Sequence, residues 1–443
     1  MKVSGTVRVP GDKSISHRAL MVAALARGRS ELSGLLSGDD VKSTARVLRR
    51  LGVDVSTVRD GAVVTVRGGR FSSPRGSLDC GNSGTTARLS LGLLAGQRFG
   101  ARLTGDASLR RRPMRRVTEP LRAMGAHIEE ERGDSLPLTI RGGRLAPLDY
   151  ASPVASAQLK SALLLAGVTG RVAVTVREPY RSRDHTERLL VHLGLDVRVD
   201  GTAVSYVPAD RPVASLGAGS SAVPPFSLIV PGDISSAAYL VAAAVLAEGG
   251  ELLLENVGVN PTRTGVLVVL ERMGARVERL NLSEAGGEPV ADLLVRPARL
   301  GATEVTAAEV PTLVDEVPVL AVLASRARPG SETLFREVGE LRVKESNRLE
   351  LIAANLQAVG GDAEASGNDL RVRGGGTDRP PRGRVDTAGD HRLAMAFAVL
   401  GTVPGADVRL SERASVAISY PRFFKDLRRI GEGGRGKGAR HRD

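Results

Sequence analysis

Residues 9 to 18 place side chains that bind anions at the start of an expected helix. Lys13, Ser14 and Arg18 follow a Pro-Gly break and open an Ala-rich run. Asp12 or Ser14 can cap this helix, whose free backbone N–H groups and dipole favour a negative charge. The pattern therefore predicts a phosphate or carboxylate site, although the same residues are also typical of a capped surface turn.

The rarity of lysine marks further candidates. The chain has 62 basic residues, and only seven of them are lysines. A lysine can lose its proton and an arginine effectively cannot, so a lysine retained inside a polar motif is a candidate for chemistry. Lys13, Lys160 and Lys344 meet this description, and an ordinary surface lysine is the alternative for each.

Composition limits the kinds of partner that we expect. The 443 residues carry a formal charge of +13, and only 3% of them are aromatic. Because few rings are available for base stacking and the basic residues are spread along the chain, we expect small anionic ligands rather than nucleic acid. No apolar stretch is long enough to span a membrane and no signal peptide is recognised, so we expect a cytoplasmic protein. The single cysteine, Cys80, excludes an internal disulfide and a cysteine-based metal cluster.

The elements that must position these residues recur along the chain. An amphipathic helix end, a glycine and a strand return at intervals of roughly 70–85 residues, as in a long-period repeat. The glycines are Gly52, Gly125, Gly194, Gly274, Gly360 and Gly431. Ala-rich helices, apolar on nearly all sides and therefore expected to be buried, lie between them. They are predicted at residues 18–28, 85–96, 157–167, 235–249, 314–327 and 391–401.

These repeats predict an α/β (α+β) fold of six βαβαββ units, arranged as a two-domain inside-out α/β barrel with buried inner helices. The first and fourth units share the phrase Val-Pro-Gly-Asp, at residues 9–12 and 230–233, which suggests a crossing between halves at each. We expect one domain from residues 1–12 and 233–430 and a second from residues 13–232, with the polar turns facing a cleft. Residues 431–443, rich in Gly and Arg, are predicted to form a disordered tail.

Six motifs, in order, resemble the 5-enolpyruvylshikimate-3-phosphate (EPSP) synthase family of enolpyruvyl transferases. They read PGDKSISHR at residues 10–18, GNSGTTAR at 81–88, SAQLKS at 156–161, RDHTE at 183–187, LRVKESNR at 341–348 and DHR at 390–392. The resemblance covers all of the chain but its tail. It implies transfer of the enolpyruvyl group of phosphoenolpyruvate to the 5-hydroxyl of shikimate 3-phosphate, with release of phosphate and without a metal or organic cofactor. It also implies a monomer.

The resemblance implies a set of residues for each substrate. Those expected to bind shikimate 3-phosphate are Lys13, Ser14, Arg18, Ser156, Ala157, Gln158, Arg183, Asp315 and Lys344. Those expected to bind phosphoenolpyruvate are Lys13, Asn82, Gly84, Arg112, Gln158, Arg348 and Arg392. Asp315 matches the proton acceptor, which Lys344 would tune, and Glu345 or Lys13 would protonate the methylene carbon. Glyphosate, which occupies the phosphoenolpyruvate pocket in this family, is expected to inhibit a chain that keeps Gly84.

Several of these residues also have purely structural interpretations. Asp315 can be a carboxylate favoured by a helix dipole, and Arg348 can pair with Glu345 at i,i+3 along one helix. His17 and His185 are more typical of structural histidines than of catalytic ones, because no nucleophile accompanies them.

Two other functions remain open. A UDP-N-acetylglucosamine enolpyruvyl transferase would share the fold and would need a reactive cysteine on a mobile loop, whereas Cys80 directly precedes the Gly81-Asn82 turn. The charge of +13 leaves a nucleic-acid-binding protein as a remote alternative.

Overall fold

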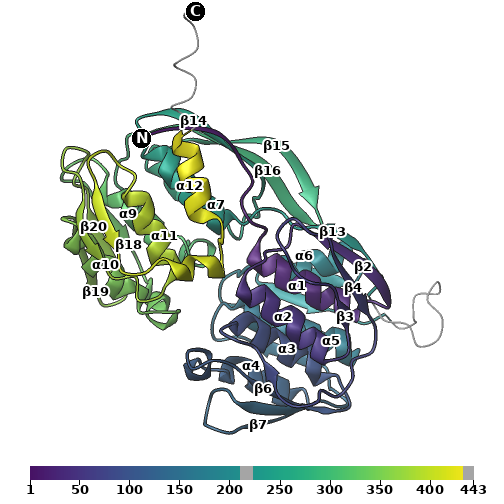
Figure 1. Cartoon of the computed structure of the whole chain (residues 1–443). Coiled ribbons are helices and arrows are strands. Elements are labelled where there is room, and N and C mark those ends of the chain that lie inside the picture. The colour runs from purple at the N-terminus through teal and green to yellow at the C-terminus, as the bar shows by residue number, and fades with distance from the viewer. Residues whose placement is uncertain (210–222, 433–443) are drawn as a thin grey trace, which may run out of the picture. The chain divides into compact units, whose positions relative to one another are not determined.

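The computed structural model describes residues 1–209 and 223–432, and the chain divides into two compact units (Figure 1). Unit 1 comprises Met1–Pro10, Gly232–Ser283 and the chain from Pro289 onward. Unit 2 comprises Gly11–Pro231 together with the short segment Glu284–Glu288. The chain therefore passes from one unit to the other beside the two Val-Pro-Gly-Asp phrases. The domain limits expected at residues 12 and 233 stay a prediction.

Five βαβαββ units follow one another in the described residues, and a sixth begins. The first contains β1 (Lys2–Val7), α1 (Lys13–Leu25), β2 (Gly28–Ser33), α2 (Asp39–Arg50), β3 (Asp54–Val55) and β4 (Val64–Gly68). The second contains β5 (Leu78–Asp79), α3 (Gly84–Ala95), β6 (Gly100–Thr104), α4 (Arg115–Ala123), β7 (His127–Glu130) and β8 (Leu138–Arg141). The third contains β9 (Leu148–Ala151), α5 (Ala157–Gly170), β10 (Val174–Arg177), α6 (His185–His192), β11 (Val197–Asp200) and β12 (Ala203–Tyr206).

The second half of the chain repeats this order. The fourth copy contains β13 (Ser227–Ile229), α7 (Ile234–Val245), β14 (Gly249–Gly258), α8 (Gly265–Arg272), β15 (Val277–Ala285) and β16 (Glu288–Val295). The fifth contains β17 (Glu304–Val305), α9 (Val317–Ser325), β18 (Glu332–Phe335), α10 (Arg348–Ala358), β19 (Asp362–Ser366) and β20 (Asp369–Arg373). The sixth contains β21 (Arg382–Val385), α11 (His391–Leu400), β22 (Asp407–Leu410) and α12 (Phe423–Glu432). In the described residues the sixth copy lacks the two closing strands, so the prediction of six complete copies was wrong there.

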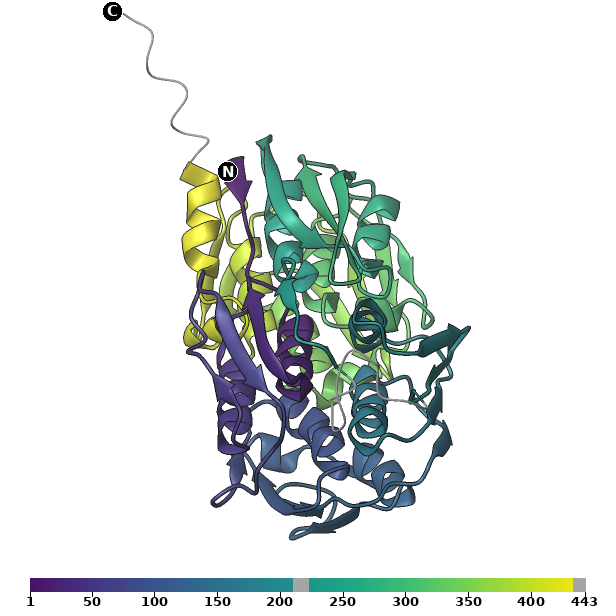
Figure 2. The same cartoon turned by 90° about the vertical axis from the view of Figure 1, so that its right-hand side faces the viewer.

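Each complete copy builds one four-stranded sheet, but the first and fourth copies exchange their first strands. β1 pairs in parallel with β14, and β13 pairs in parallel with β2. Figure 2 shows β1 beside the C-terminal helix α12, which packs on it. The mixed α/β class is confirmed. The sheets remain separate, and no closed barrel of strands forms among residues 1–209 and 223–432.

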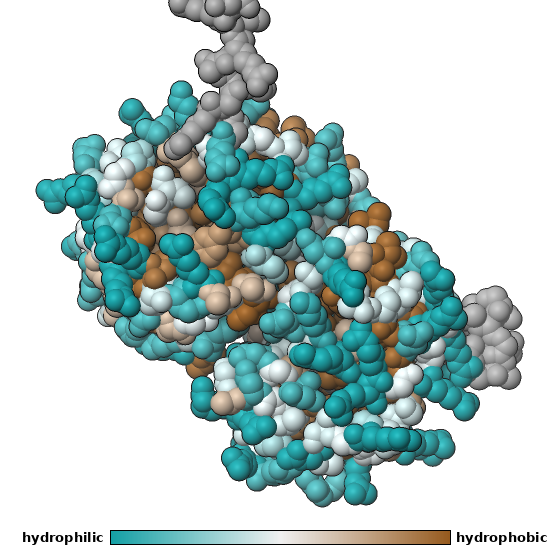
Figure 3. Space-filling view, in the orientation of Figure 1, coloured by the Kyte–Doolittle hydropathy of each residue, from teal (hydrophilic) through white to brown (hydrophobic). Residues whose placement is uncertain are grey.

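The Ala-rich helices form the cores of the two units, as their composition predicts. α1, α3 and α5 belong to the apolar clusters of unit 2, and α7, α9 and α11 belong to that of unit 1. Each is buried over nearly its whole length. Hydrophilic residues cover much of the face seen in Figure 3, with apolar residues between them, as expected when amphipathic outer helices turn their apolar sides inward.

Polar turns begin five of these six inner helices with a side-chain cap. The capping residues, whose side chains accept a hydrogen bond from a first-turn backbone N–H, are Asp12, Ser83, Ser156, Asp233 and Asp390. Each such cap is worth about 0.5–2 kcal/mol of stability. Four of the six motifs, at residues 10–18, 81–88, 156–161 and 390–392, therefore stand at the N-termini of buried inner helices.

The predicted glycine stops hold for five of the six outer helices. The glycines after α2, α4, α6, α8 and α10 have positive φ, as a left-handed cap requires. Gly431 instead lies inside α12, which continues to Glu432, so the stop predicted there was wrong. The tail predicted to begin at residue 431 thus starts within a helix, and residues 433–443 lie outside the described part of the chain.

Candidate functional site

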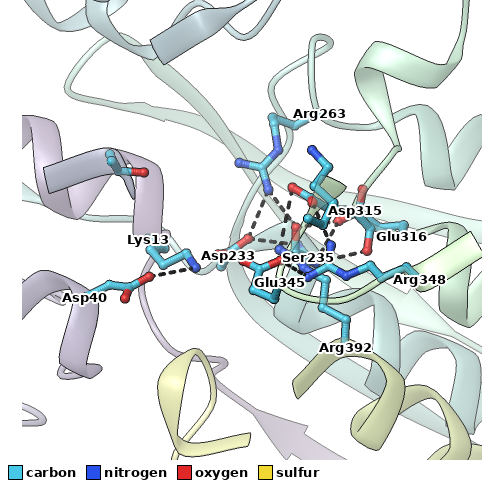
Figure 4. A network of polar contacts seen from close by, with 12 residues as sticks. Lys13, Asp40, Asp233, Ser235, Arg263, Asp315, Glu316, Glu345, Arg348 and Arg392 are labelled. Atoms are coloured by element: carbon cyan, nitrogen blue, oxygen red, sulfur yellow. Dashed lines mark hydrogen bonds and ion pairs between the residues drawn. The ribbon is translucent and has the colours of Figure 1, made fainter. Parts of the chain in front are cut away.

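The predicted site residues belong to both units, and we describe the two sets separately. In unit 2, Lys13 is the first residue of α1. Its Nζ lies 3.2 Å from Oδ2 of Asp40, which stands in the first turn of α2 (Figure 4). One fifth of the Lys13 side chain is exposed. The ammonium is therefore accessible at a helix N-terminus, where an arriving anion would compete with Asp40 for it.

Arg18 lies one turn further along α1 and is buried. Its Nε donates to Oγ1 of Thr186 at 2.6 Å, and Nη2 donates to Oγ of Ser161 at 2.7 Å. Nη1 donates to the backbone carbonyl of Ser14 at 3.0 Å. Burial lowers the pKa of Arg18 to about 10, so the guanidinium remains charged at neutral pH. Most of its donors are thus engaged by protein groups, which tie α1 to α5 and α6.

The start of α5 carries three predicted residues in a row. Ser156 caps the helix, and its own backbone N–H donates to Oε1 of Glu178 at 2.8 Å. Ala157 is the first helical residue, and the side chain of Gln158 is half-buried. Arg183 lies in the loop before α6, where its charge helps to lower the pKa of Arg18. The structure therefore brings Ser156, Gln158 and Arg183 to the same part of unit 2 as Arg18.

Gln158 also contacts Arg88, which is not among the predicted site residues. Its Oε1 accepts from Nη1 of Arg88 at 2.8 Å, and its Nε2 donates to Oγ1 of Thr85 at 2.9 Å. Burial, together with the charges of Arg116 and Arg112, lowers the pKa of Arg88 to about 9. An anion bound here would relieve the repulsion between these cations. Arg88 could have been found in the sequence, because it closes the GNSGTTAR motif.

The turn ahead of α3 completes this set. Nη2 of Arg112 donates to Oδ1 of Asn82, whose Nδ2 donates to Oδ2 of Asp106 at 2.7 Å. Gly84 is the first residue of α3. A Cβ atom added at Gly84 would lie 2.9 Å from Nη1 of Arg88 and 3.6 Å from Nη1 of Arg112. The missing side chain therefore keeps these two guanidinium groups open at a helix N-terminus.

In unit 1, Arg348 collects three carboxylates around one buried guanidinium (Figure 4). Its Nε donates to Oδ2 of Asp390 at 2.7 Å, Nη1 lies 3.4 Å from Oδ1 of Asp315, and Nη2 donates to Glu345. Burial alone would lower the pKa of Arg348, but Glu345 and Asp390 outweigh it and raise the pKa. The i,i+3 pairing with Glu345 that the sequence allows is present. Asp390, which the sequence analysis quoted only within a motif, is the most buried member of the group.

Asp315 lies between two guanidinium groups. Its Oδ2 is 3.6 Å from Nη2 of Arg392, and its backbone carbonyl accepts from Nη1 of Arg392 at 3.1 Å. It also stands directly before the N-cap of α9, as the structural interpretation of this residue predicts. The Asp315 carboxylate therefore faces two positive charges, which attract it.

A chain of hydrogen bonds and ion pairs links Arg392 to buried residues of unit 1. Glu316 is buried, lies 3.7 Å from Nη1 of Arg392 and accepts from the hydroxyl of Ser235. That hydroxyl also accepts from Arg263 at 2.7 Å, and Arg263 lies 3.2 Å from Asp233 (Figure 4). No local pattern in the sequence connects these residues, because they come from three repeats.

Lys344 does not lie against Asp315 in this structure. It follows the 3-10 helix η3 (Gly339–Val343), and its ammonium is paired with Glu340. Asn347 caps α10. The predicted tuning of Asp315 by Lys344 therefore stays a prediction, and it would require Lys344 to change its rotamer or its loop to move.

His17, His185 and Cys80 occupy buried positions. Burial is the main cause that lowers the pKa of His17 to about 3, and its Nδ1 lies 2.7 Å from Oγ1 of Thr44. Nδ1 of His185 lies 2.7 Å from Oε1 of Glu288. Cys80 is fully buried, and burial raises the pKa of its thiol to about 12. A cysteine of this kind is inert.

The described residues show neither a metal-binding cluster nor a membrane-spanning helix. Among residues 1–209 and 223–432, no group of three or more His, Cys, Asp or Glu side chains is arranged to hold a metal ion. In the same residues, no helix is long and apolar enough to cross a membrane.

Comparison with known proteins relates the whole arrangement to one family. The family model described as EPSP synthase (3-phosphoshikimate 1-carboxyvinyltransferase) matches residues 1–427. The chain is 46% identical over 430 residues to the 3-phosphoshikimate 1-carboxyvinyltransferase of Geobacillus thermodenitrificans, covering 96% of each chain. It is 49% identical over 428 residues to the protein of the same name from Thermus thermophilus, again covering 96% of each.

Solved structures agree with the sequence relatives. EPSP synthase from Acinetobacter baumannii superposes with a TM-score of 0.85 at 37% identity, over 97% of this chain and 96% of that one. The enolpyruvyl transferase NikO from Streptomyces tendae superposes with a TM-score of 0.74 at 21% identity, over 97% of this chain and 95% of that one. The second similarity concerns the fold alone.

Proposed function

Because this chain belongs to the EPSP synthase (3-phosphoshikimate 1-carboxyvinyltransferase) family, it is a transferase of that class, and we propose which of its residues do the work. Its substrates are phosphoenolpyruvate and shikimate 3-phosphate, each of which carries a phosphate and a carboxylate. Cationic side chains at helix N-termini suit both groups. The product, 5-enolpyruvylshikimate 3-phosphate, belongs to the shikimate pathway.

The division of charge between the two sets of residues supports this assignment. The unit 2 set contains Lys13, Arg18, Arg88, Arg112 and Arg183, and we assign it the binding of the anionic groups. The unit 1 set places five carboxylates against three arginines, namely Asp233, Asp315, Glu316, Glu345 and Asp390 against Arg263, Arg348 and Arg392. We assign this second set the transfer of protons and the support of Arg348 and Arg392, which bind phosphoenolpyruvate.

The reaction follows as an addition and an elimination. Asp315 accepts the proton of the 5-hydroxyl of shikimate 3-phosphate while the hydroxyl oxygen forms a bond to C2 of phosphoenolpyruvate. Glu345 or Lys13 delivers a proton to the methylene carbon C3. Glu345 or Lys13 then takes a proton back from C3 of the tetrahedral adduct while the C2–O bond to phosphate breaks, which restores the double bond and releases phosphate. The observation that carries the assignment of Asp315 is its position between Arg348 and Arg392.

The enolpyruvyl transferase that acts on a UDP-sugar is the second candidate within the fold. Its chemistry would require a reactive cysteine, and Cys80 is buried with a raised thiol pKa. We therefore favour shikimate 3-phosphate as the acceptor. A monomer that works in the cytoplasm without nucleic acid is part of the same proposal.

The test is phosphate release from phosphoenolpyruvate, measured with shikimate 3-phosphate, with UDP-N-acetylglucosamine and with neither. We expect release only with shikimate 3-phosphate. An Asp315→Ala variant should lose at least about a hundredfold in kcat, because removal of a general base typically costs about 10²–10⁴-fold. Asp407→Ala, which removes an exposed carboxylate paired with Arg409, is the matched control and should keep full activity. Release with UDP-N-acetylglucosamine instead would refute the assigned acceptor.

A further inference from the structure

Lys160 is a buried lysine that the proposed reaction does not use. Its side chain is 1% exposed, and its Nζ lies 2.7 Å from Oε2 of Glu178 and 2.8 Å from Oε1 of Glu187. Both carboxylates are buried as well. Burial alone would lower the pKa of Lys160, but the two carboxylates outweigh it and raise the pKa. The ammonium is therefore held as a charged group inside the protein and is not available as a base.

Glu178 uses its remaining capacity on the backbone of two segments. Its Oε1 accepts from the backbone N–H of Ser156 at 2.8 Å and from the hydroxyl of Ser182 at 2.7 Å. The backbone N–H of Ser182 points to Oε2 at 3.3 Å. Ser156 begins α5, and Ser182 directly precedes Arg183. The Glu178 carboxylate thus fixes the backbone at Ser156, which is assigned to shikimate 3-phosphate, and at Ser182, which directly precedes the assigned residue Arg183.

Glu187 connects the same lysine to α6 and to Arg18. The residue before it, Thr186, accepts from Nε of Arg18 at 2.6 Å and lies 2.7 Å from the hydroxyl of Ser161 on α5. The charge of Glu187 counteracts the loss of charge that burial favours in Arg18. Burial raises the pKa of Glu187, and the ammonium of Lys160 opposes this rise.

We infer that Lys160, Glu178 and Glu187 form a positioning cluster for the shikimate 3-phosphate half of the site. The inference rests on the proposed function. The three side chains do not touch the substrate in this assignment. They lock α5, α6 and the loop between residues 178 and 184 around one ammonium group, and so hold Ser156, Arg183 and Arg18 in place before the substrate arrives.

The experiment compares Glu178→Gln and Glu178→Ala with the unchanged full-length protein. Glutamine keeps an oxygen that can accept from Ser156, whereas alanine does not. We expect the Kd for shikimate 3-phosphate, measured by calorimetry without phosphoenolpyruvate, to rise at least about tenfold in Glu178→Ala and less in Glu178→Gln. The KM for phosphoenolpyruvate should change less than about threefold. Leu163→Ala, a core truncation in the same helix, is the control for lost stability alone.

The outcomes separate the cluster from a general effect on folding. A Kd for shikimate 3-phosphate that is unchanged in both Glu178 variants would overturn the inference. An equal rise of this Kd in Leu163→Ala, at a melting temperature that matches that of Glu178→Ala, would also overturn it, because the effect would then come from lost stability. If Glu178→Ala does not fold, as judged by circular dichroism, the comparison of Glu178→Gln with Leu163→Ala decides in the same way. Failure of the unchanged protein to bind shikimate 3-phosphate or release phosphate would refute the proposed function itself.

Discussion

Asp390 offers the sharpest test of how the unit 1 carboxylates and arginines support one another. The carboxylate has no exposed surface. Its Oδ2 accepts from Nε of Arg348 at 2.7 Å and from the hydroxyl of Ser346 at 3.0 Å, while its Oδ1 accepts from the backbone N–H of Arg392 at 2.9 Å and caps α11. Asp390→Asn keeps the shape of the side chain and can still cap the helix, but it removes the charge.

The expected loss can be worked out from these contacts. Removing one partner of a buried ion pair costs about 3–5 kcal/mol, since the other charge is left without compensation. Arg348 keeps Glu345 and Asp315, so we expect the lower end, about 3 kcal/mol, for Asp390→Asn. Asp390→Ala also loses the cap, which adds about 1 kcal/mol. Both variants should raise the KM for phosphoenolpyruvate, because Arg348 and Arg392 lose a group that holds them.

The loss should also depend on pH. Burial by itself would raise the pKa of Asp390, but Arg348 outweighs it and holds the pKa below its usual range. A carboxylate with a depressed pKa in the folded state stabilises the protein above its unfolded pKa, about 3.9, and this contribution is lost as the pH falls further. The difference between the unchanged protein and Asp390→Asn should therefore be constant from neutral pH to about pH 5 and shrink below about pH 4.

Urea unfolding followed by circular dichroism measures this difference. Asp407→Asn, which breaks an exposed pair with Arg409, is the control and should cost about 0–1 kcal/mol. The reasoning is refuted if the free energy of unfolding of Asp390→Asn lies within about 1 kcal/mol of that of the unchanged protein, since breaking a buried ion pair should cost more than breaking an exposed one. A difference that grows on acidification would refute the assigned sign of the pKa shift.

Three further predictions concern single residues. Burial lowers the pKa of His17 to about 3 in the folded protein, whereas the unfolded chain binds a proton below its own histidine pKa of about 6.5, so the free energy of unfolding falls by about 2 kcal/mol by pH 5. The free energy of unfolding of His17→Gln should depend less on pH over this range. Equal pH dependence would contradict the prediction. Burial raises the thiol pKa of Cys80 to about 12, so iodoacetamide at about pH 8 should alkylate it only after denaturation, as mass spectrometry would report; rapid labelling of the folded protein would favour the UDP-sugar enzyme. In Gly84→Ala the new methyl group would lie 2.9 Å from Nη1 of Arg88. The KM for phosphoenolpyruvate and the inhibition constant of glyphosate should therefore each rise about tenfold. Inhibition by glyphosate that is no weaker than in the unchanged protein would show that Gly84 does not border the phosphoenolpyruvate pocket.

Much of the fold follows from patterns that a single segment carries. The inner helices begin at polar caps such as Asp12 and Ser156, and most outer helices end at a positive-φ glycine such as Gly52. Gly431 departs from this pattern, because α12 continues past it and packs on β1. The packing of α12 on β1 joins segments far apart in the sequence, and a local pattern cannot report it.

The candidate site divides in the same way. The family resemblance predicts Lys13, Gln158, Asp315 and Arg348 as site residues, and each of them lies at the start of a helix. The motifs do not distinguish the three retained lysines. Lys13 remains accessible, Lys344 pairs with Glu340, and Lys160 is enclosed by two carboxylates.

The repeats, the buried helices, their polar N-termini and the family could therefore be predicted from the amino-acid sequence, since they rest on local propensity and on short motifs that recur along the chain. The tertiary structure alone decided the exchange of β1 and β13 and the grouping of Asp315, Arg348 and Asp390. It also decided the burial of Lys160. These features join residues from different helices, strands and loops, and their free energy comes from pairing and desolvation, which exist only once the segments have packed together.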